Sequence, residues 1–251
     1  MTTAAIPQDY LVTDDDGCRY TRTCLVGGAV LLGIGAIAQF VPVFLLPVAT
    51  ALILPRWMIN LHELLHVYGP EEVHPAIRCL GVSPVPLSLI SLSYDEIRTL
   101  HFAHHAAPAT ADDPDAYHIC GSWPRVIFNA FTAPEQSSLY WLRTHGLSTR
   151  LLIGLLLKLL LLALLAGLSG GAFLWFWLCL RLVYGLGDLA FFRLVHHQGG
   201  RYGTFSLALP ASVTTLGELI VGKTVMQTTL HHSVHHRHPR IAARCLALCQ
   251  D

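Results

Sequence analysis

The sequence predicts an all-α integral membrane protein, a helical bundle with about four transmembrane helices. Of its 251 residues, 53% are hydrophobic and only 13% are charged, whereas soluble proteins average roughly 25% charged residues. Three apolar segments, residues 25–54, 151–169 and 172–195, are long enough to enter a bilayer. We therefore expect the outer surface of the bundle to face lipid.

The first apolar segment, residues 25–54, predicts two short spans. As one helix it would be about 45 Å long, against a hydrocarbon core of roughly 30 Å. Gln39 is its only strongly polar residue, and Pro42 follows it closely, so we place a turn at residues 39–42. A single long, tilted helix is the alternative.

The segments 151–169 and 172–195 predict an antiparallel hairpin of two further spans, joined by a glycine-rich turn at residues 167–171. Neither this turn nor the one at residues 39–42 contains Lys or Arg. Cations instead precede the first span, occupy the loop between the second and third, and follow the fourth. The positive-inside rule then predicts a multi-pass protein with both termini and the central loop in the cytoplasm.

Two shorter apolar stretches, residues 79–92 and 205–221, cannot span a membrane. Each contains proline, and each would either lie in the membrane interface or pack as an ordinary loop.

The composition argues against several classes of protein. The formal net charge is zero, so no nucleic-acid partner is expected. The seven cysteines are odd in number and form no C-x-x-C pair, which favours a reducing compartment over a disulfide framework. The N-terminal segment is acidic, and a signal peptide would begin with positive charge.

Histidine is the most informative residue type. The chain has 15 histidines against 16 lysines and arginines together. In the first cluster two histidines are four residues apart and share one helical face, which suits a metal ion. The second and third share an H-x-x-H-H spacing, so each can present three imidazoles on one helical stripe. The clusters are His62 and His66; His101, His104 and His105; and His232, His235 and His236.

Eight imidazoles are too many for one ion with four to six ligands, so the clusters predict a site for two metal ions. No full span separates the first two clusters, and one hairpin separates the second from the third. All three therefore lie on the same, cytoplasmic side. Imidazole suits Fe, Zn, Cu and Ni, which leaves the identity of the metal open.

These clusters resemble the three histidine boxes of the membrane fatty acid desaturase superfamily. The run His-His-Arg-His-Pro at residues 235–239 resembles the H-H-x-x-P close of its third box. The run Thr-Ala-Asp-Asp-Pro-Asp at residues 110–115 resembles the T-x-D-D-P-D of bacterial carotenoid ketolases in the same superfamily. The resemblance predicts a desaturase-like domain over residues 25–240, between a cytoplasmic N-terminal segment (1–24) and a C-terminal tail (241–251).

The resemblance implies a non-haem di-iron centre that uses O2 as co-substrate, with no catalytic residue beyond the metal centre. The eight histidines of the boxes would be ligands, and either His196 or His197 would supply a ninth; we favour His196. Asp115 and Asp188 are expected to support the ligands without touching the metal. Asp188 lies inside a span, where ionisable groups are usually paired or functional; a pair with Arg181 or a purely structural role is open.

The implied activity is removal of hydrogen from a lipid C–H bond. We favour a fatty acyl-lipid desaturase, and a carotenoid ketolase or hydroxylase is the alternative because the boxes do not choose between these reactions. The sequence contains neither a C-x-x-C-H nor a G-x-G-x-x-G motif, so a separate electron donor such as a ferredoxin is expected.

Two other readings compete with this one. The run His62-Glu63-x-x-His66 also matches the zinc protease motif, in which Glu is the general base, but an intramembrane protease would leave boxes two and three unused. A histidine-rich metal-binding or transport protein would carry histidines along its spans. His74, His118 and His145 stand alone and are expected not to be ligands.

Overall fold

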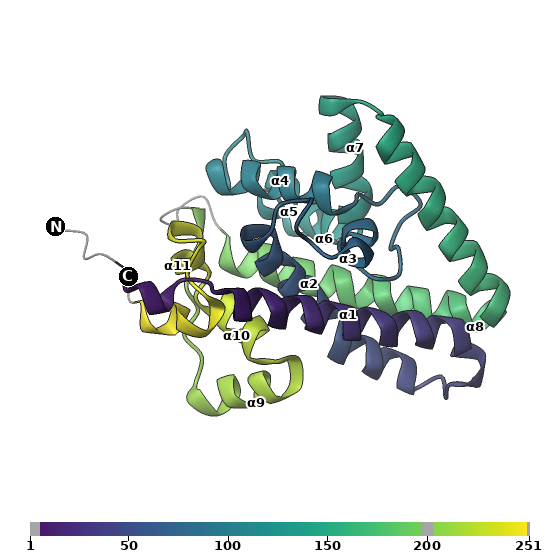
Figure 1. Ribbon diagram of the computed structural model, residues 1–251, viewed down its shortest axis with the longest axis horizontal. Coiled ribbons are helices and arrows are strands. Elements are labelled where there is room, and N and C mark those ends of the chain that lie inside the picture. The colour runs from purple at the N-terminus through teal and green to yellow at the C-terminus, as the bar shows by residue number, and fades with distance from the viewer. Residues whose placement is uncertain (1–5, 197–202, 250–251) are drawn as a thin grey trace.

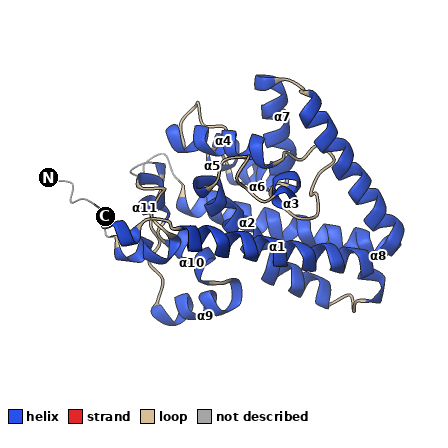
Figure 2. Ribbon diagram, viewed as in Figure 1, coloured by secondary structure: helices blue, strands red, loops and turns tan. Residues whose placement is uncertain are grey.

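The computed structural model describes residues 6–196 and 203–249. Within them, every regular element is a helix, and the only β-structure is two isolated bridges (Figure 2). The predicted all-α class is therefore confirmed. Three of the described helices are long and apolar enough to cross a membrane, covering Asp14–Phe40, Leu45–Val67 and Thr149–Val195.

The first apolar segment forms two separate helices, α1 (Asp14–Ile37) and α2 (Leu45–Val67). A short 3₁₀ helix, Ala38–Phe40, follows α1, so the chain turns where Gln39 and Pro42 predicted it. Both helices are longer than the short spans expected. Helix α1 begins early because Thr13 and Asp16 form a capping box, and α2 continues into the first histidine box.

The second hydrophobic region forms helix α8 (Thr149–Val195), 47 residues interrupted at Gly170. Gly170 has φ 52° and ψ −133°, a conformation that glycine adopts without the steric cost of a Cβ. A straight helix of this length would extend about 70 Å. The two arms instead fold back at an acute angle (Figure 1), so the predicted hairpin is present with its turn at the predicted glycines.

Helices α1, α2 and α8 pack together around a buried apolar core. Its fully buried side chains include Leu31 of α1, Leu54 of α2 and Phe176 of α8. On the outside, α8 exposes large apolar side chains; Leu160 is 66% exposed and Leu174 is 63% exposed. Such a surface is suited to lipid.

Shorter helices lie beside this core and at one end of it (Figure 1). Between α2 and α8 lie five of them: α3 (Pro75–Leu80), α4 (Tyr94–Ala106), α5 (Ala116–Ile119), α6 (Trp123–Phe131) and α7 (Ala133–His145). After α8 come α9 (Ala211–Val221), α10 (Lys223–Leu230), α11 (His232–Arg237) and the 3₁₀ helix Ala243–Leu248.

The two short apolar stretches behave differently. In residues 79–92, Val85 and Leu87 are fully buried, so this stretch packs as an ordinary loop. Helix α9, in residues 205–221, has no buried residue, and Leu219 is 78% exposed. Arg56 of α2 donates to the carbonyls that end α9, the closest being Ile220 at 2.8 Å.

The first and last described segments of the chain lie side by side, near α11 (Figure 1). Val12 N–H donates to the Arg240 carbonyl, and Ala242 N–H donates to the Tyr10 carbonyl, both at 2.9 Å. Arg244 also pairs with Asp16 at 3.2 Å. The predicted C-terminal tail is thus packed against the start of α1 over the residues that are described.

Candidate metal centre

Four segments far apart in the sequence bring histidines to one region: the end of α2, helix α4, the end of α8 and helix α11. Tyr94 fixes α4 against α2, because its hydroxyl lies 2.8 Å from the Leu64 carbonyl oxygen and 2.9 Å from that of Tyr68. Arg98 adds to this junction by donating from Nε to the Leu65 carbonyl at 3.0 Å. The first two histidine boxes therefore face each other.

The first histidine group gathers five side chains whose ligand atoms all lie within 4.8 Å of one another. His66 Nε2 is 2.7 Å from His101 Nε2 and 3.1 Å from His235 Nε2. One ring nitrogen carries at most a single proton, so it cannot donate to both neighbours. Nitrogens that converge in this way suit a shared cation. The group consists of His62, His66, His101, His105 and His235.

The second histidine group contains His104, His196 and His236, under the same distance limit. His196 Nε2 lies 3.1 Å from His104 Nε2 and 3.1 Å from His232 Nε2, so His232 joins this group. The two groups touch where the rings of His105 and His236 stack, with centroids 4.1 Å apart. The two histidine groups therefore form two adjacent sites that share one wall.

Boxes two and three each divide their histidines between the groups. We expected the three imidazoles of a box to share one stripe. Instead His104 and His105 belong to different groups, as do His235 and His236, because neighbouring residues on a helix are about 100° apart. The structure nonetheless brings all nine histidines favoured as ligands together. His197, the alternative for the ninth, lies outside the described residues.

Several ring nitrogens in these groups are buried without a hydrogen-bond partner among the described residues: His62 Nε2 and both nitrogens of His105 and His236. An unsatisfied buried polar atom costs about 1–3 kcal/mol. Burial and neighbouring imidazoles lower the pKa of His105 to about 2 and hold the pKa of His236 well below its ordinary value. These rings are therefore neutral at pH 7, the form that binds metals, so the donor set fits metal ions.

Buried carboxylates orient two of the rings. Asp113 Oδ1 lies 2.9 Å from His104 Nδ1, and Glu63 Oε1 lies 3.2 Å from His62 Nδ1. Thr228 donates its hydroxyl to the same Glu63 oxygen at 2.8 Å. An ionised carboxylate accepts the proton on Nδ1, which leaves Nε2 with a free lone pair.

Asp115 and Asp188, the expected supporting residues, meet at His118. Asp188 Oδ2 is 2.8 Å from His118 Nδ1, and Asp115 Oδ1 is 3.4 Å from His118 Nε2. Asp115 comes only within 3.8 Å of His104 Nδ1, so Asp113 is the closer carboxylate. Burial alone would lower the pKa of His118, but the two carboxylates raise it to about 10.

Arg181 pairs with a different carboxylate from the one considered in the sequence. Its NH1 lies 2.9 Å from Oε1 of Glu135, on α7. The guanidinium also donates to the carbonyls of Leu87 and Phe131, each at 2.8 Å. Arg181 therefore joins α8 to its neighbours and leaves Asp188 to His118.

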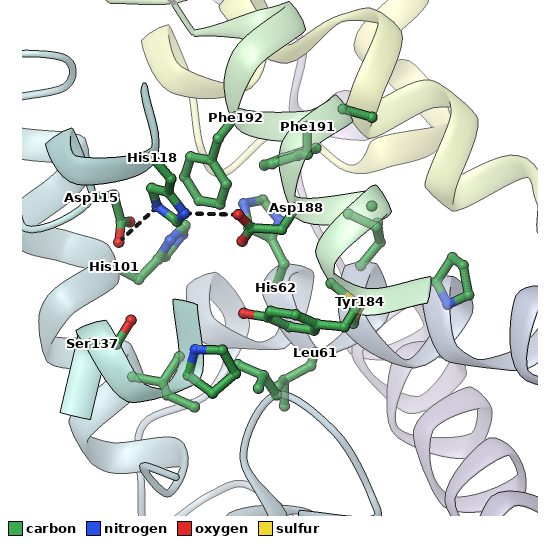
Figure 3. A pocket seen from close by; sticks show the side chains of 18 of the residues that line it. Leu61, His62, His101, Asp115, His118, Ser137, Tyr184, Asp188, Phe191 and Phe192 are labelled. Atoms are coloured by element: carbon green, nitrogen blue, oxygen red, sulfur yellow. Dashed lines mark hydrogen bonds and ion pairs between the residues drawn. The ribbon is translucent and has the colours of Figure 1, made fainter. Parts of the chain in front are cut away.

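An apolar cavity of about 360 Å³ reaches the first histidine group, with His62 and His101 in its wall (Figure 3). Most of the remaining wall is apolar and comes from α2, α4, α8 and α10. Phe191 also lines the cavity, and its ring centroid is 5.9 Å from that of His62 and 4.5 Å from that of His232. The cavity can hold a hydrocarbon beside the histidines.

The protease reading of box one does not match this geometry. As a general base, Glu63 would need a free carboxylate, but Glu63 is 3% exposed and its Oε1 is engaged by both His62 and Thr228. Boxes two and three, which a protease would leave unused, complete both histidine groups.

The sequence did not predict the contacts of three residues in this region. Asp115, and not Asp113, was the carboxylate expected to support the ligands. Glu63 was considered only as a protease base, and His118 was expected only not to be a ligand. The Asp-Asp-Pro-Asp run marks a turn but does not show which carboxylate faces inward. The position of Glu63 next to a histidine of box one could have indicated that it supports a ligand. The sequence gives no comparable indication for His118, because it is an isolated histidine.

Comparison with known proteins gives one result. The family model described as fatty acid desaturase matches residues 38–249, which include all three boxes. Searches of curated proteins and of solved structures gave no match.

Proposed function

This chain belongs to the fatty acid desaturase family, as its histidine boxes predicted, and we propose that it is a membrane-bound di-iron oxidoreductase that uses O2 to oxidise a lipid C–H bond. One observation carries this proposal. Nine histidines from four distant segments form two adjacent groups at the end of an apolar cavity. We assign one iron to each group.

The ligands of the two ions would be the imidazoles of the two histidine groups. When bound, the irons would supply the activation of O2 and the oxidation of the C–H bond. Asp113 and Glu63 hold Nδ1 of His104 and of His62, so that each ring presents Nε2. Such supporting contacts fix both the tautomer and the orientation of a ligand.

The cavity would position the substrate and exclude water. Its apolar wall accepts a hydrocarbon chain, and His62 and His101 border the same space, so a methylene group can lie against the first group. Exclusion of water protects a reactive centre from side reactions. In a desaturation, two hydrogens leave the lipid, and O2, two electrons and two protons complete two molecules of water.

We favour a fatty acyl-lipid as the substrate, because an apolar cavity next to the histidines suits an acyl chain. A carotenoid is the second candidate, because the Asp113–Asp115 segment that resembles carotenoid ketolases lies directly at the site. A separate electron carrier, such as a ferredoxin, would supply the two electrons. The cation pattern supports a multi-pass protein with its active site on the cytoplasmic side.

Product analysis in expressing cells tests this proposal. Cells that make the wild-type chain are supplied with acyl lipids or with β-carotene, and their lipids are analysed by mass spectrometry under O2 and without it. We expect an O2-dependent product that lacks two hydrogens, or that carries a new hydroxyl or keto oxygen. His235→Ala should abolish it. His145→Ala should not, because His145 is exposed and stacks on Trp141 outside both groups. A product that persists in His235→Ala would refute the proposal.

A further inference from the structure

The cavity beside the histidines is not uniformly apolar. Tyr184 of α8 lines it, is only 7% exposed, and directs its hydroxyl into the space (Figure 3). No other group in the described part of the chain forms a hydrogen bond with this hydroxyl. The phenolic oxygen is open to the cavity and not sealed within the protein, so it is suited to bind a ligand atom.

Two carboxylates border the same space. Asp188 follows Tyr184 by one helical turn on α8, so both side chains lie on one face. Asp115 lines the cavity as well, and His118 lies between the two carboxylates (Figure 3). His118 Nδ1 engages Oδ2 of Asp188, and a carboxylate has about four acceptor sites in all. Acceptors and a phenolic hydroxyl therefore occur together on an otherwise apolar wall.

The chemistry of this wall matches an alcohol better than other oxygen groups. A lipid hydroxyl can accept a hydrogen bond from the Tyr184 hydroxyl and donate its own proton to a carboxylate such as Asp188. A ketone, ester or ether can only accept, and a plain hydrocarbon can do neither. A lipid phosphate would meet two carboxylates and be repelled.

We propose that the Tyr184 hydroxyl, together with the carboxylate of Asp188, forms a hydroxyl-binding subsite within the substrate cavity. The substrate is then a lipid that already carries a hydroxyl group. Phe191, which contacts His62, follows Tyr184 by seven residues, a rise of roughly 10 Å along the helix. This inference rests on the proposed function, since it deepens the substrate class of the same cavity.

Binding measurements on the purified full chain test the subsite without turnover. Two matched pairs of probes are used: β-carotene with its 3-hydroxy derivative, and methyl palmitate with hydroxylated methyl palmitates. Dissociation constants are compared for the wild type, Tyr184→Phe and Tyr140→Phe. Tyr140 is a matched control because it lies on α7 and does not line the cavity.

We expect the wild type to bind the hydroxylated member of at least one pair more tightly by about tenfold or more, the combined effect of two hydrogen bonds. Tyr184→Phe should reduce this preference several-fold, because only the bond to Asp188 remains. It should bind the probe without a hydroxyl normally, which also shows that it is folded. Tyr140→Phe should keep the full preference. The O-methyl ether of the preferred probe can accept from Tyr184 but cannot donate to Asp188, so it should bind the wild type several-fold more weakly than the alcohol does.

Equal affinities within both pairs, or a preference that is undiminished in Tyr184→Phe, would overturn the subsite. If that variant does not fold, the methyl ether decides alone: an ether that binds as tightly as the alcohol overturns the proposal. The pair that shows the preference identifies the lipid scaffold. Failure of the proposed function would appear separately, as absence of bound iron or of an O2-dependent product.

Discussion

His104 Nδ1 lies 2.9 Å from Oδ1 of Asp113, and both side chains are almost completely buried. The same carboxylate accepts from the backbone N–H of Ala109 at 2.6 Å and of Asp115 at 2.8 Å. Backbone N–H groups of its own loop thus hold Asp113 in place independently of its contact with His104. The contact sets the tautomer of a ring that faces the second histidine group.

Asp113→Asn should therefore weaken metal binding in the second group. An amide can turn its NH2 toward His104, which moves the ring proton to Nε2 and blocks the lone pair that faces His196. Loss of such supporting contacts lowers metal affinity about 10–100-fold. Competition with a chelator measures the change. Asp112→Asn is the control, because Asp112 is exposed in the same loop; equal metal affinity in the two variants would contradict the role of Asp113.

Glu63 gives a prediction that separates the two readings of box one. If Glu63 orients His62, Glu63→Gln should lower the affinity of the first group for metal, and Thr228→Val should act in the same direction. If Glu63 were a protease base, Gln would leave metal binding intact and abolish peptide cleavage. Glu71→Gln is a control, since the Glu71 side chain is 84% exposed. Titration with a colorimetric chelator distinguishes the outcomes.

The histidine groups should make the metal-free protein sensitive to acid. Burial, followed by neighbouring imidazoles, holds the pKa of five histidines below the ordinary value; they are His101, His105, His232, His235 and His236. Unfolded histidines titrate near pH 6.5, so below that pH the unfolded chain binds more protons than the folded one. The free energy of unfolding must then fall as the pH falls.

Thermal unfolding of the chelator-treated protein between pH 8 and pH 5 measures this effect. We expect the melting temperature to drop progressively as the pH falls below about 6.5. Above that pH it should decline slightly toward pH 8, because the carboxylates raise the pKa of His118 to about 10 in the folded chain. A melting temperature that rises as the pH falls from 6.5 to 5 would mean that the five rings are protonated in the folded state.

Two glycines of α8 test how closely the helices pack. A Cβ on Gly185 would overlap the ring of Phe131 on α6, whereas a Cβ on Gly187 would meet nothing within 4 Å. Gly185→Ala should therefore destabilise the fold by about 1–3 kcal/mol. Gly187→Ala should stabilise it by roughly 0.5–1 kcal/mol, because alanine loses less backbone entropy than glycine. Denaturation in detergent measures both signs, and an equal effect of the two changes would contradict the packing described.

Much of the fold follows from local properties of the sequence. The breaks at residues 38–44 and at Gly170 coincide with Gln39, Pro42 and the glycine run, because polar and flexible residues interrupt apolar helices wherever they occur. The early start of α1 was missed. It depends on the Thr13–Asp16 capping box, which extends a helix through polar residues that hydropathy assigns to a loop.

The site, like the fold, was only partly predictable from the sequence. The spacing of the boxes predicted which histidines assemble, because periodicity and span count are both local. The partners of charged groups were not predictable, since they depend on which distant segments meet. Arg181 pairs with Glu135, 46 residues away, and Asp188 pairs with His118, 70 residues away. The choice of Asp113 over Asp115 depends on how one tight loop folds around its own N–H groups.

Metal content tests the central claim most directly. The detergent-purified wild type would be analysed for iron and zinc beside His104→Ala, His235→Ala and the exposed control His145→Ala. The two histidine groups predict about two irons per chain in the wild type and in His145→Ala. They also predict loss of iron in both other variants, because each removes a nitrogen from one group. A single zinc per chain that survives in His104→Ala and His235→Ala would contradict the di-iron centre.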